Sequence, residues 1–192
     1  MTTAAIVLAG GRSSRFGRDK LTEPIDGVPM LERAVAAVGG VVDEVLVVVA
    51  PGAAAAIPAG ARRIEDARAF EGPLAGVDAG LAATDAEVVL IVGGDMPSLV
   101  PAVLRRLIEA LADRAVDAAV LEAGGRHRPL PMALRRGPAI AITATLLASD
   151  ERRLRALRDG LALAVVPDVV WQVDDPDGAT LCDIDRPDDL EA

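Results

Sequence analysis

A single lysine follows a glycine-rich run near the start of the chain. Lys20 is the only lysine among 20 basic residues, and the run before it reads Leu-Ala-Gly-Gly-Arg-Ser-Ser-Arg-Phe-Gly-Arg-Asp from Leu8 to Asp19. A lysine ammonium binds a phosphate as a compact point charge, whereas arginine presents a planar fork. An apolar segment, 4–9, leads into the run, so the order is strand, glycine loop and cation. This order presents backbone N–H groups and positive charge to a polyphosphate.

The two glycines at the start of this run are adjacent, at Gly10 and Gly11. Glycine reaches backbone angles closed to other residues and lets a ligand approach the main chain. The spacing differs from the G-x-G-x-x-G of dinucleotide-binding folds, and Lys20 lacks the flanking Gly and Ser or Thr of a P-loop. Two interpretations stay open here: a phosphate-binding loop, and a glycine-rich turn whose charges, Arg15 among them, are solvated.

A carboxylate follows the most hydrophobic strand candidate, 87–92. The sequence there continues as Val-Gly-Gly-Asp-Met-Pro over 92–97, with Asp95 on a turn that its glycines keep flexible. Ligands of open α/β sheets bind outside the carboxyl ends of the strands, where Asp95 could hold Mg²⁺ on the phosphates of a nucleotide. The alternative is that Asp95 caps the helix that follows. Ser98 is nearer to the cap position, which favours the metal site.

Asp66 ends a shorter strand candidate, 62–66, so it too is expected at the ligand edge of the sheet. The segment Gly-Pro-Leu-Ala-Gly follows it over 72–76. Gly76 permits close approach of a nucleotide base or of another backbone. An ordinary helix start explains the same pattern equally well.

Near the C-terminal end, the segment Leu-Cys-Asp-Ile-Asp places Asp183 and Asp185 on one side of an extended chain, because side chains alternate. Asp185 could then contribute a second metal ligand. The competing interpretation is a surface strand end whose aspartates cap a short helix.

Apolar segments alternate with helical patterns along most of the chain, which predicts an α/β fold. We expect a single three-layer α/β/α domain over residues 1–192, with a mostly parallel, Rossmann-like sheet. The strand candidates are 4–9, 44–50, 62–66, 87–92, 118–123, 131–136, 162–166 and 169–173. The helix candidates are 29–38, 74–83, 99–112, 139–147 and 151–158.

Composition narrows the class of protein. The formal net charge is -9, and a nucleic-acid binder would more often show a basic face with aromatic residues, of which this chain has three. The longest apolar stretch, 45–61, is interrupted by prolines and is shorter than the roughly 20 residues that cross a bilayer. One cysteine allows no internal disulfide. We therefore expect a cytoplasmic protein that binds neither nucleic acid nor membrane.

Four segments of the chain together resemble the motifs of the MobA-like nucleotidyltransferases. They are Leu-Ala-Gly-Gly-x-Ser-x-Arg-x-Gly-x-Asp-Lys, Gly-Pro-Leu-Ala-Gly, Gly-Asp-Met-Pro and Asp-Ile-Asp-x-Pro-Asp-Asp-Leu. Within that family the chain is most similar to the molybdenum cofactor guanylyltransferases, because of the segment 72–76. The resemblance implies that GTP and molybdopterin react to give the guanine dinucleotide cofactor and pyrophosphate. It also implies Mg²⁺ as cofactor, and molybdopterin-delivery proteins or molybdoenzymes as candidate partners.

The resemblance also assigns roles to individual residues. It gives catalytic roles to Arg15, Lys20 and Asp95, and it gives Mg²⁺ to Asp95, with Asp185 as a second candidate ligand. The positions expected to bind the nucleotide are Leu8, Ala9, Gly10, Gly11, Lys20, Asp66, Gly76 and Asp95.

One departure bears on the acceptor. The family usually carries Asn-Ile-Asn where this chain has Asp-Ile-Asp at 183–185, and related cytidylyl and sugar-phosphate nucleotidyltransferases also end in Asp-Ile-Asp. Transfer from CTP to molybdopterin, or from a nucleotide to another phosphate, therefore stays open. A nucleotide-binding adaptor without activity is a further alternative, against which the intact Lys20 and Asp95 argue.

Overall fold

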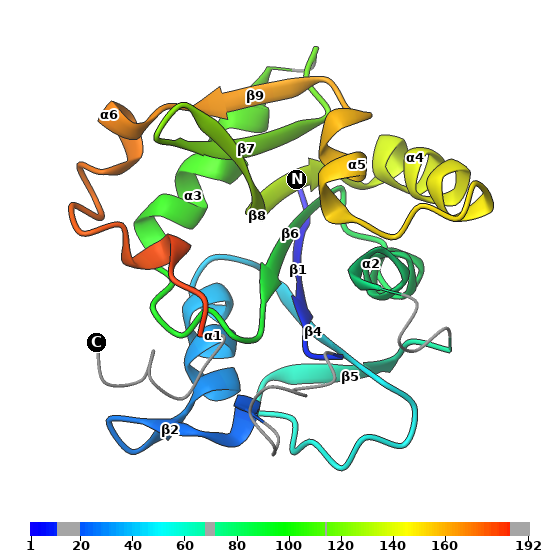
Figure 1. Cartoon of the computed structure of the whole chain (residues 1–192), viewed down its shortest axis with the longest axis vertical. Coiled ribbons are helices and arrows are strands. Elements are labelled where there is room, and N and C mark those ends of the chain that lie inside the picture. The colour runs from blue at the N-terminus through cyan, green and yellow to red at the C-terminus, as the bar shows by residue number, and fades with distance from the viewer. Residues whose placement is uncertain (11–19, 68–71, 114, 185–192) are drawn as a thin grey trace.

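A seven-stranded sheet forms the centre of the computed structural model, which describes residues 1–10, 20–67, 72–113 and 115–184 (Figure 1). The strand order is β5-β4-β1-β6-β8-β7-β9. Neighbouring strands pair in parallel except β8, which is antiparallel to both β6 and β7. The strands are β1 (Thr3–Leu8), β4 (Glu44–Val49), β5 (Ala61–Glu65), β6 (Val88–Gly93), β7 (Ala118–Ala123), β8 (Arg126–Arg135) and β9 (Leu163–Val166), with a small separate pair of β2 (Pro24–Ile25) and β3 (Val28–Pro29).

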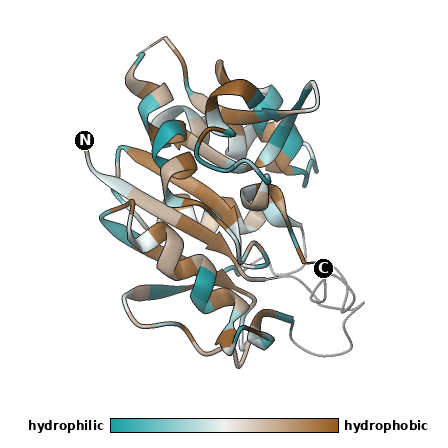
Figure 2. Ribbon diagram, turned by 90° about the vertical axis from the view of Figure 1, so that its left-hand side faces the viewer, coloured by the Kyte–Doolittle hydropathy of each residue, from teal (hydrophilic) through white to brown (hydrophobic). Residues whose placement is uncertain are grey.

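Helices cover both faces of the sheet, and the strands between them carry the most hydrophobic residues (Figure 2). Alternate residues of each strand point to opposite faces: Val7 packs into one core cluster and its neighbour Ile6 into the other. The first cluster includes residues of α1 (Met30–Gly39), α3 (Pro101–Glu109) and α6 (Asp168–Trp171). The second includes residues of α2 (Pro73–Ala82), α4 (Arg136–Ala148) and α5 (Leu154–Asp159).

The chain reverses its direction of travel across the sheet between β1 and β6. It adds β4 and then β5 on one side of β1 and returns to place β6 on the other side. The register aligns the last residues of the two strands, Leu8 beside Gly93. Such a switch point is where open α/β sheets bind their ligands, at the carboxyl ends of the strands.

Most of the predicted elements are confirmed, including the three-layer, mostly parallel architecture. The strand predicted over 169–173 is wrong, because this segment begins with the helix α6. Pro167 occupies the position before the first turn, and Trp171 alone of α6 is buried, with its indole N–H donating to the carbonyl of Glu122 over 2.8 Å. No helix in the described parts of the chain is long and apolar enough to cross a membrane.

Gly80 is where α2 packs most closely on the sheet. A Cβ atom there would lie 2.6 Å and 2.7 Å from the Cδ1 and Cγ1 atoms of Ile6, a fully buried residue of β1. We expect Gly80→Ala to lower the free energy of unfolding by about 1–3 kcal/mol, because a branched side chain in a packed core has little room to move. Chemical denaturation followed by circular dichroism measures this effect.

Gly39→Ala is the matched control for that prediction. Gly39 is also helical, but the nearest atom to a Cβ there is 4.0 Å away, so the better helix propensity of alanine should stabilise the protein by up to about 1 kcal/mol. Equal effects of the two substitutions would contradict the proposed crowding at Gly80.

Candidate active site

The backbone of residues Leu8 to Gly10 lies at the middle of the ligand edge of the sheet. The N–H of Ala9 donates to the carbonyl of Val48 over 2.8 Å, and the N–H of Gly94 donates to the carbonyl of Leu8 over 2.9 Å. These bonds extend the pairing of β1 with both neighbouring strands past the end of the strand. The start of the glycine-rich run is therefore held beside the turn that carries Asp95.

Lys20 and Asp95 form an ion pair at this edge. The Nζ atom of Lys20 lies 2.8 Å from Oδ2 of Asp95, and the two side chains are 14% and 28% exposed. Gly93 allows the carboxylate to fold back over the end of β6, since a Cβ atom at Gly93 would lie 2.3 Å from Oδ1 of Asp95. The pair joins two segments that were expected to meet at the ligand edge, and both side chains keep access to solvent.

A third segment forms hydrogen bonds with both members of this pair through its backbone. The carbonyl of Ile184 accepts a hydrogen bond from Nζ of Lys20 over 2.9 Å, and the N–H of Ile184 donates to the carbonyl of Asp95 over 3.0 Å. The side chain of Ile184 is buried in the core beside α1 and α3. Sequence reasoning missed Ile184 because the group that reaches the site is a main-chain carbonyl, which no residue type or spacing marks in the sequence.

Asp66 lies at the same edge, two strands away from β1. Its N–H donates to the carbonyl of Val49 over 3.0 Å, which continues the pairing of β5 with β4, and the residue is 8% exposed. The structure thus places Asp66 at the carboxyl end of β5, as the sequence predicts. Its contact with a nucleotide stays a prediction.

Gly76 faces the sheet. A Cβ atom there would lie 3.2 Å from Cδ2 of Leu8 and 3.5 Å from Cγ1 of Val48, so the glycine lets α2 pack closely behind β1 and β4. The structure thereby gives Gly76 a packing contact, and its expected contact with the nucleotide stays a prediction.

The start of α2 rests on a second loop that sequence reasoning did not connect with it. Gly72 has φ of 104°, and a Cβ atom there would lie 2.8 Å from Cβ of Arg152, whose carbonyl accepts from the N–H of Leu74 over 3.3 Å. Glu151 fixes this loop: hydrogen bonds from the Arg153 side chain, and from the backbone N–H groups of Arg153 and Arg152, hold the pKa of its carboxyl well below the usual range. The loop therefore packs against the start of the segment 72–76 and holds it in place.

The carboxylate of Asp95 is the described group that could bind a magnesium ion. Among the described residues there is no group of three or more His, Cys, Asp or Glu side chains that could hold a metal. Mg²⁺ commonly needs one or two carboxylates, with phosphates and water as its other ligands. Asp95 supplies one partly exposed carboxylate at the ligand edge, which meets the smaller of these two demands. Asp183 is exposed, and Gly11, Arg15 and Asp185 lie outside the described residues.

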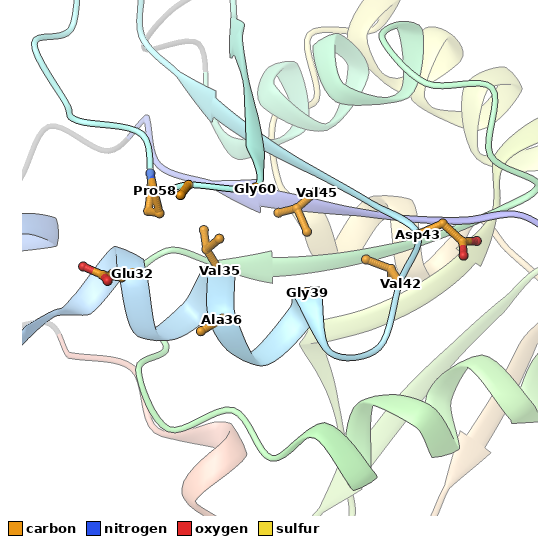
Figure 3. A pocket seen from close by; sticks show the side chains of 10 residues that line it. Glu32, Val35, Ala36, Gly39, Val42, Asp43, Val45, Pro58 and Gly60 are labelled. Carbon is orange, nitrogen blue, oxygen red and sulfur yellow. The ribbon is translucent and has the colours of Figure 1, made fainter.

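A separate hollow of about 330 Å³ runs along α1 (Figure 3). Val35 of α1 and Val45 of β4 point toward each other across it, while Glu32 and Asp43 lie at its two ends. The hollow is lined neither by Lys20 and Asp95 nor by the other ligand-edge residues described above. It is therefore distinct from the candidate active site.

The sequence matches known proteins along nearly its whole length. A sequence model described as the MobA-like NTP transferase domain matches residues 5–165. A probable molybdenum cofactor guanylyltransferase of Chloroflexus aggregans is 35% identical over an alignment 196 positions long, which covers 100% of this chain and 93% of that protein. A molybdenum cofactor guanylyltransferase of Burkholderia vietnamiensis is also 35% identical, over 79% of this chain and 78% of its own.

Solved structures share the fold. Molybdopterin-guanine dinucleotide biosynthesis protein A of Archaeoglobus fulgidus superposes with a TM-score of 0.81 at 20% identity, over 99% of this chain and 95% of that one. The 2-C-methyl-D-erythritol 4-phosphate cytidylyltransferase of Thermus thermophilus gives a TM-score of 0.74 at 21% identity, over 100% and 96% of the two chains. At these identities the likeness is one of architecture.

Proposed function

The chain belongs to the MobA-like NTP transferase family, and we propose that it transfers GMP from GTP to the terminal phosphate of molybdopterin, with release of pyrophosphate. The names of its relatives support this reaction over others on the same fold. The observation that carries the proposal is the Lys20–Asp95 pair, which lies at the switch point between β1 and β6.

The reaction exchanges one phosphoanhydride bond for another. An oxygen of the molybdopterin phosphate attacks the α-phosphorus of GTP, and the bond from that phosphorus to the bridging oxygen of the β-phosphate breaks. The leaving pyrophosphate keeps the electron pair. The nucleophile is already an anion at neutral pH, so it needs no general base. It needs in-line placement and positive charge that offsets the repulsion between phosphates.

The described residues can meet both needs. The backbone of Leu8, Ala9 and Gly10 would line the nucleotide, and Lys20 would place its ammonium on the phosphates. Asp95 would hold Mg²⁺, whose charge stabilises the phosphates in the transition state. Until substrate binds, Lys20 and Asp95 neutralise each other across 2.8 Å, so neither charge is left unpaired at the edge of the core.

Several assignments extend this proposal. Gly11 and Arg15 would line the phosphates, Asp66 and Gly76 would lie on the nucleotide side, and Asp185 would be a second ligand of Mg²⁺. We place the reaction in the cytoplasm, with the whole chain acting as one catalytic domain. Proteins that deliver molybdopterin or receive the finished cofactor are the proposed partners.

Nucleotide competition tests the function directly. We expect the purified protein to release pyrophosphate from GTP when molybdopterin and Mg²⁺ are present, and to use CTP, ATP and UTP at least about tenfold less efficiently, a difference of about 1.4 kcal/mol in transition-state binding. The guanine dinucleotide product is identified by mass spectrometry, and a chelator should abolish its formation. A preference for CTP, or binding of GTP without transfer, would contradict the proposal.

A further inference from the structure

Residues 174–184, here termed the strap, connect α6 to the Lys20–Asp95 pair. Figure 1 shows this part of the chain in orange to red, running from α6 toward α1. A short 3-10 helix, η3 (Ala179–Leu181), lies in its middle. Two polar residues of the strap, Asp175 and Thr180, are 4% and 0% exposed, and their side chains form hydrogen bonds within the strap and to the residue before α3. Burial of polar groups costs free energy unless they are hydrogen-bonded, so their partners show what they hold in place.

Asp175 closes the turn that starts η3. Its Oδ1 atom accepts from the N–H of Ala179 over 2.9 Å, and its Oδ2 atom accepts from the N–H of Thr180 over 2.7 Å. Its backbone carbonyl accepts from the N–H of Gly178, which has φ of 70°. Both carboxylate oxygens are thus used locally, and the buried side chain fixes the shape of the turn.

Thr180 attaches this turn to α3. Its Oγ1 atom accepts from the N–H of Val100, the residue before the first turn of α3, over 3.1 Å. Asp174 pairs with Arg106 of the same helix. α3 begins at Pro101, six residues after Asp95, so the strap is attached to the element that follows the turn of Asp95.

The far end of the strap contacts the Lys20–Asp95 pair. Ile184 buries its side chain in the core and bonds to Asp95 through its N–H and to Lys20 through its carbonyl. A lysine ammonium on a flexible stem can point in many directions. The carbonyl of Ile184 supplies a fixed acceptor 2.9 Å from Nζ, which limits those directions.

We propose that Asp175 and Thr180 are positioning residues for Lys20, acting through the strap and the carbonyl of Ile184. The inference rests on the proposed function, in which Lys20 binds the phosphates of GTP. Lys20 exchanges Asp95 for a phosphate when substrate binds, and it keeps Ile184 as the partner that sets its direction.

Substitutions that remove single acceptors test this role. Thr180→Val keeps the shape but leaves the N–H of Val100 without an acceptor, and Asp175→Asn retains one acceptor oxygen for two N–H groups. We expect each to lower kcat about 10- to 100-fold, because displacement of a catalytic group by about 1 Å costs this much, and to change KM for GTP less than threefold. Thr180→Ser keeps the acceptor and should retain more than half of the wild-type kcat. All assays run well below each variant's melting temperature.

A double-mutant cycle separates positioning from general loosening. If Thr180 acts through Lys20, Thr180→Val should change single-turnover transfer less than twofold in a Lys20→Ala background. An equal loss in both backgrounds, or a wild-type kcat for Thr180→Val, would overturn the inference.

Amide hydrogen exchange at Ile184 gives a readout that needs no activity. We expect exchange at least tenfold faster in Thr180→Val and Asp175→Asn than in the wild type and in Thr180→Ser. Unchanged exchange in the first two variants would overturn the positioning role. A wild-type protein without guanylyl transfer would instead overturn the proposed function, so the two failures can be told apart.

Discussion

Asp95→Asn is expected to lower the turnover number for guanylyl transfer by about 10²–10³-fold, the range observed when one preorganised electrostatic contact is removed. Asparagine keeps the shape of the side chain at the end of β6 but not its charge. The variant loses the proposed ligand of Mg²⁺, and Lys20 loses the carboxylate that lies 2.8 Å from its Nζ atom. Steady-state rates at saturating GTP measure the effect, and a higher Mg²⁺ requirement should accompany it.

Asp85→Asn is the matched control for this prediction. Asp85 has a fully exposed side chain, lies just before β6 at the opposite end of the strand, and has Arg136 at 3.7 Å. Exposed pairs contribute little to stability, so this variant should keep the wild-type turnover number. Near-normal turnover by Asp95→Asn at limiting Mg²⁺ would remove Asp95 from the proposed metal site.

Lys20→Ala should produce a loss of similar size, about 10²–10³-fold, because it removes the described cation next to Asp95. Lys20→Arg should recover only a small part of the activity. The Nζ atom lies between Oδ2 of Asp95 and the carbonyl of Ile184 at 2.8 and 2.9 Å, a space suited to a compact ammonium rather than to a wide guanidinium. Both kcat and the affinity for GTP should be measured.

Arg62→Ala controls for the loss of a paired cation elsewhere. Arg62 pairs with Glu44 at the start of β4, and both side chains are more than a third exposed. We expect its removal to leave guanylyl transfer unchanged. Full activity of Lys20→Arg would show that any cation at position 20 suffices. That result would contradict the expectation that the site requires the compact ammonium of lysine.

Much of the fold is predictable from local pattern. The run 88–92 is hydrophobic at every position, and the strand β6 that contains it lies fully buried in the middle of the sheet, as such a run indicates. The segment 169–173 misled the same reasoning, because three exposed valines imitate a strand while Pro167 and the buried Trp171 define a helix. In such a short element, the tertiary contact of one buried side chain outweighs the β propensity of its valines.

The residues of the site that lie at the ends of strands could be predicted from the sequence. Asp66 and Asp95 both follow strands whose carboxyl ends share one edge, so their placement follows from the topology. The contact of Gly76 with Leu8 depends on how closely α2 packs, and the contact of Ile184 with Lys20 joins residues 164 positions apart. No periodicity in the sequence encodes a main-chain carbonyl at that separation.

The position of Ile184 in the chain also has a consequence for biosynthesis. Every strand of the sheet, through Val166, leaves the ribosome before residue 184 does. Lys20 can therefore gain its carbonyl partner only after every strand of the sheet has been synthesised. The contact between Lys20 and Ile184 is thus one of the last in the described chain for which both partners become available during translation.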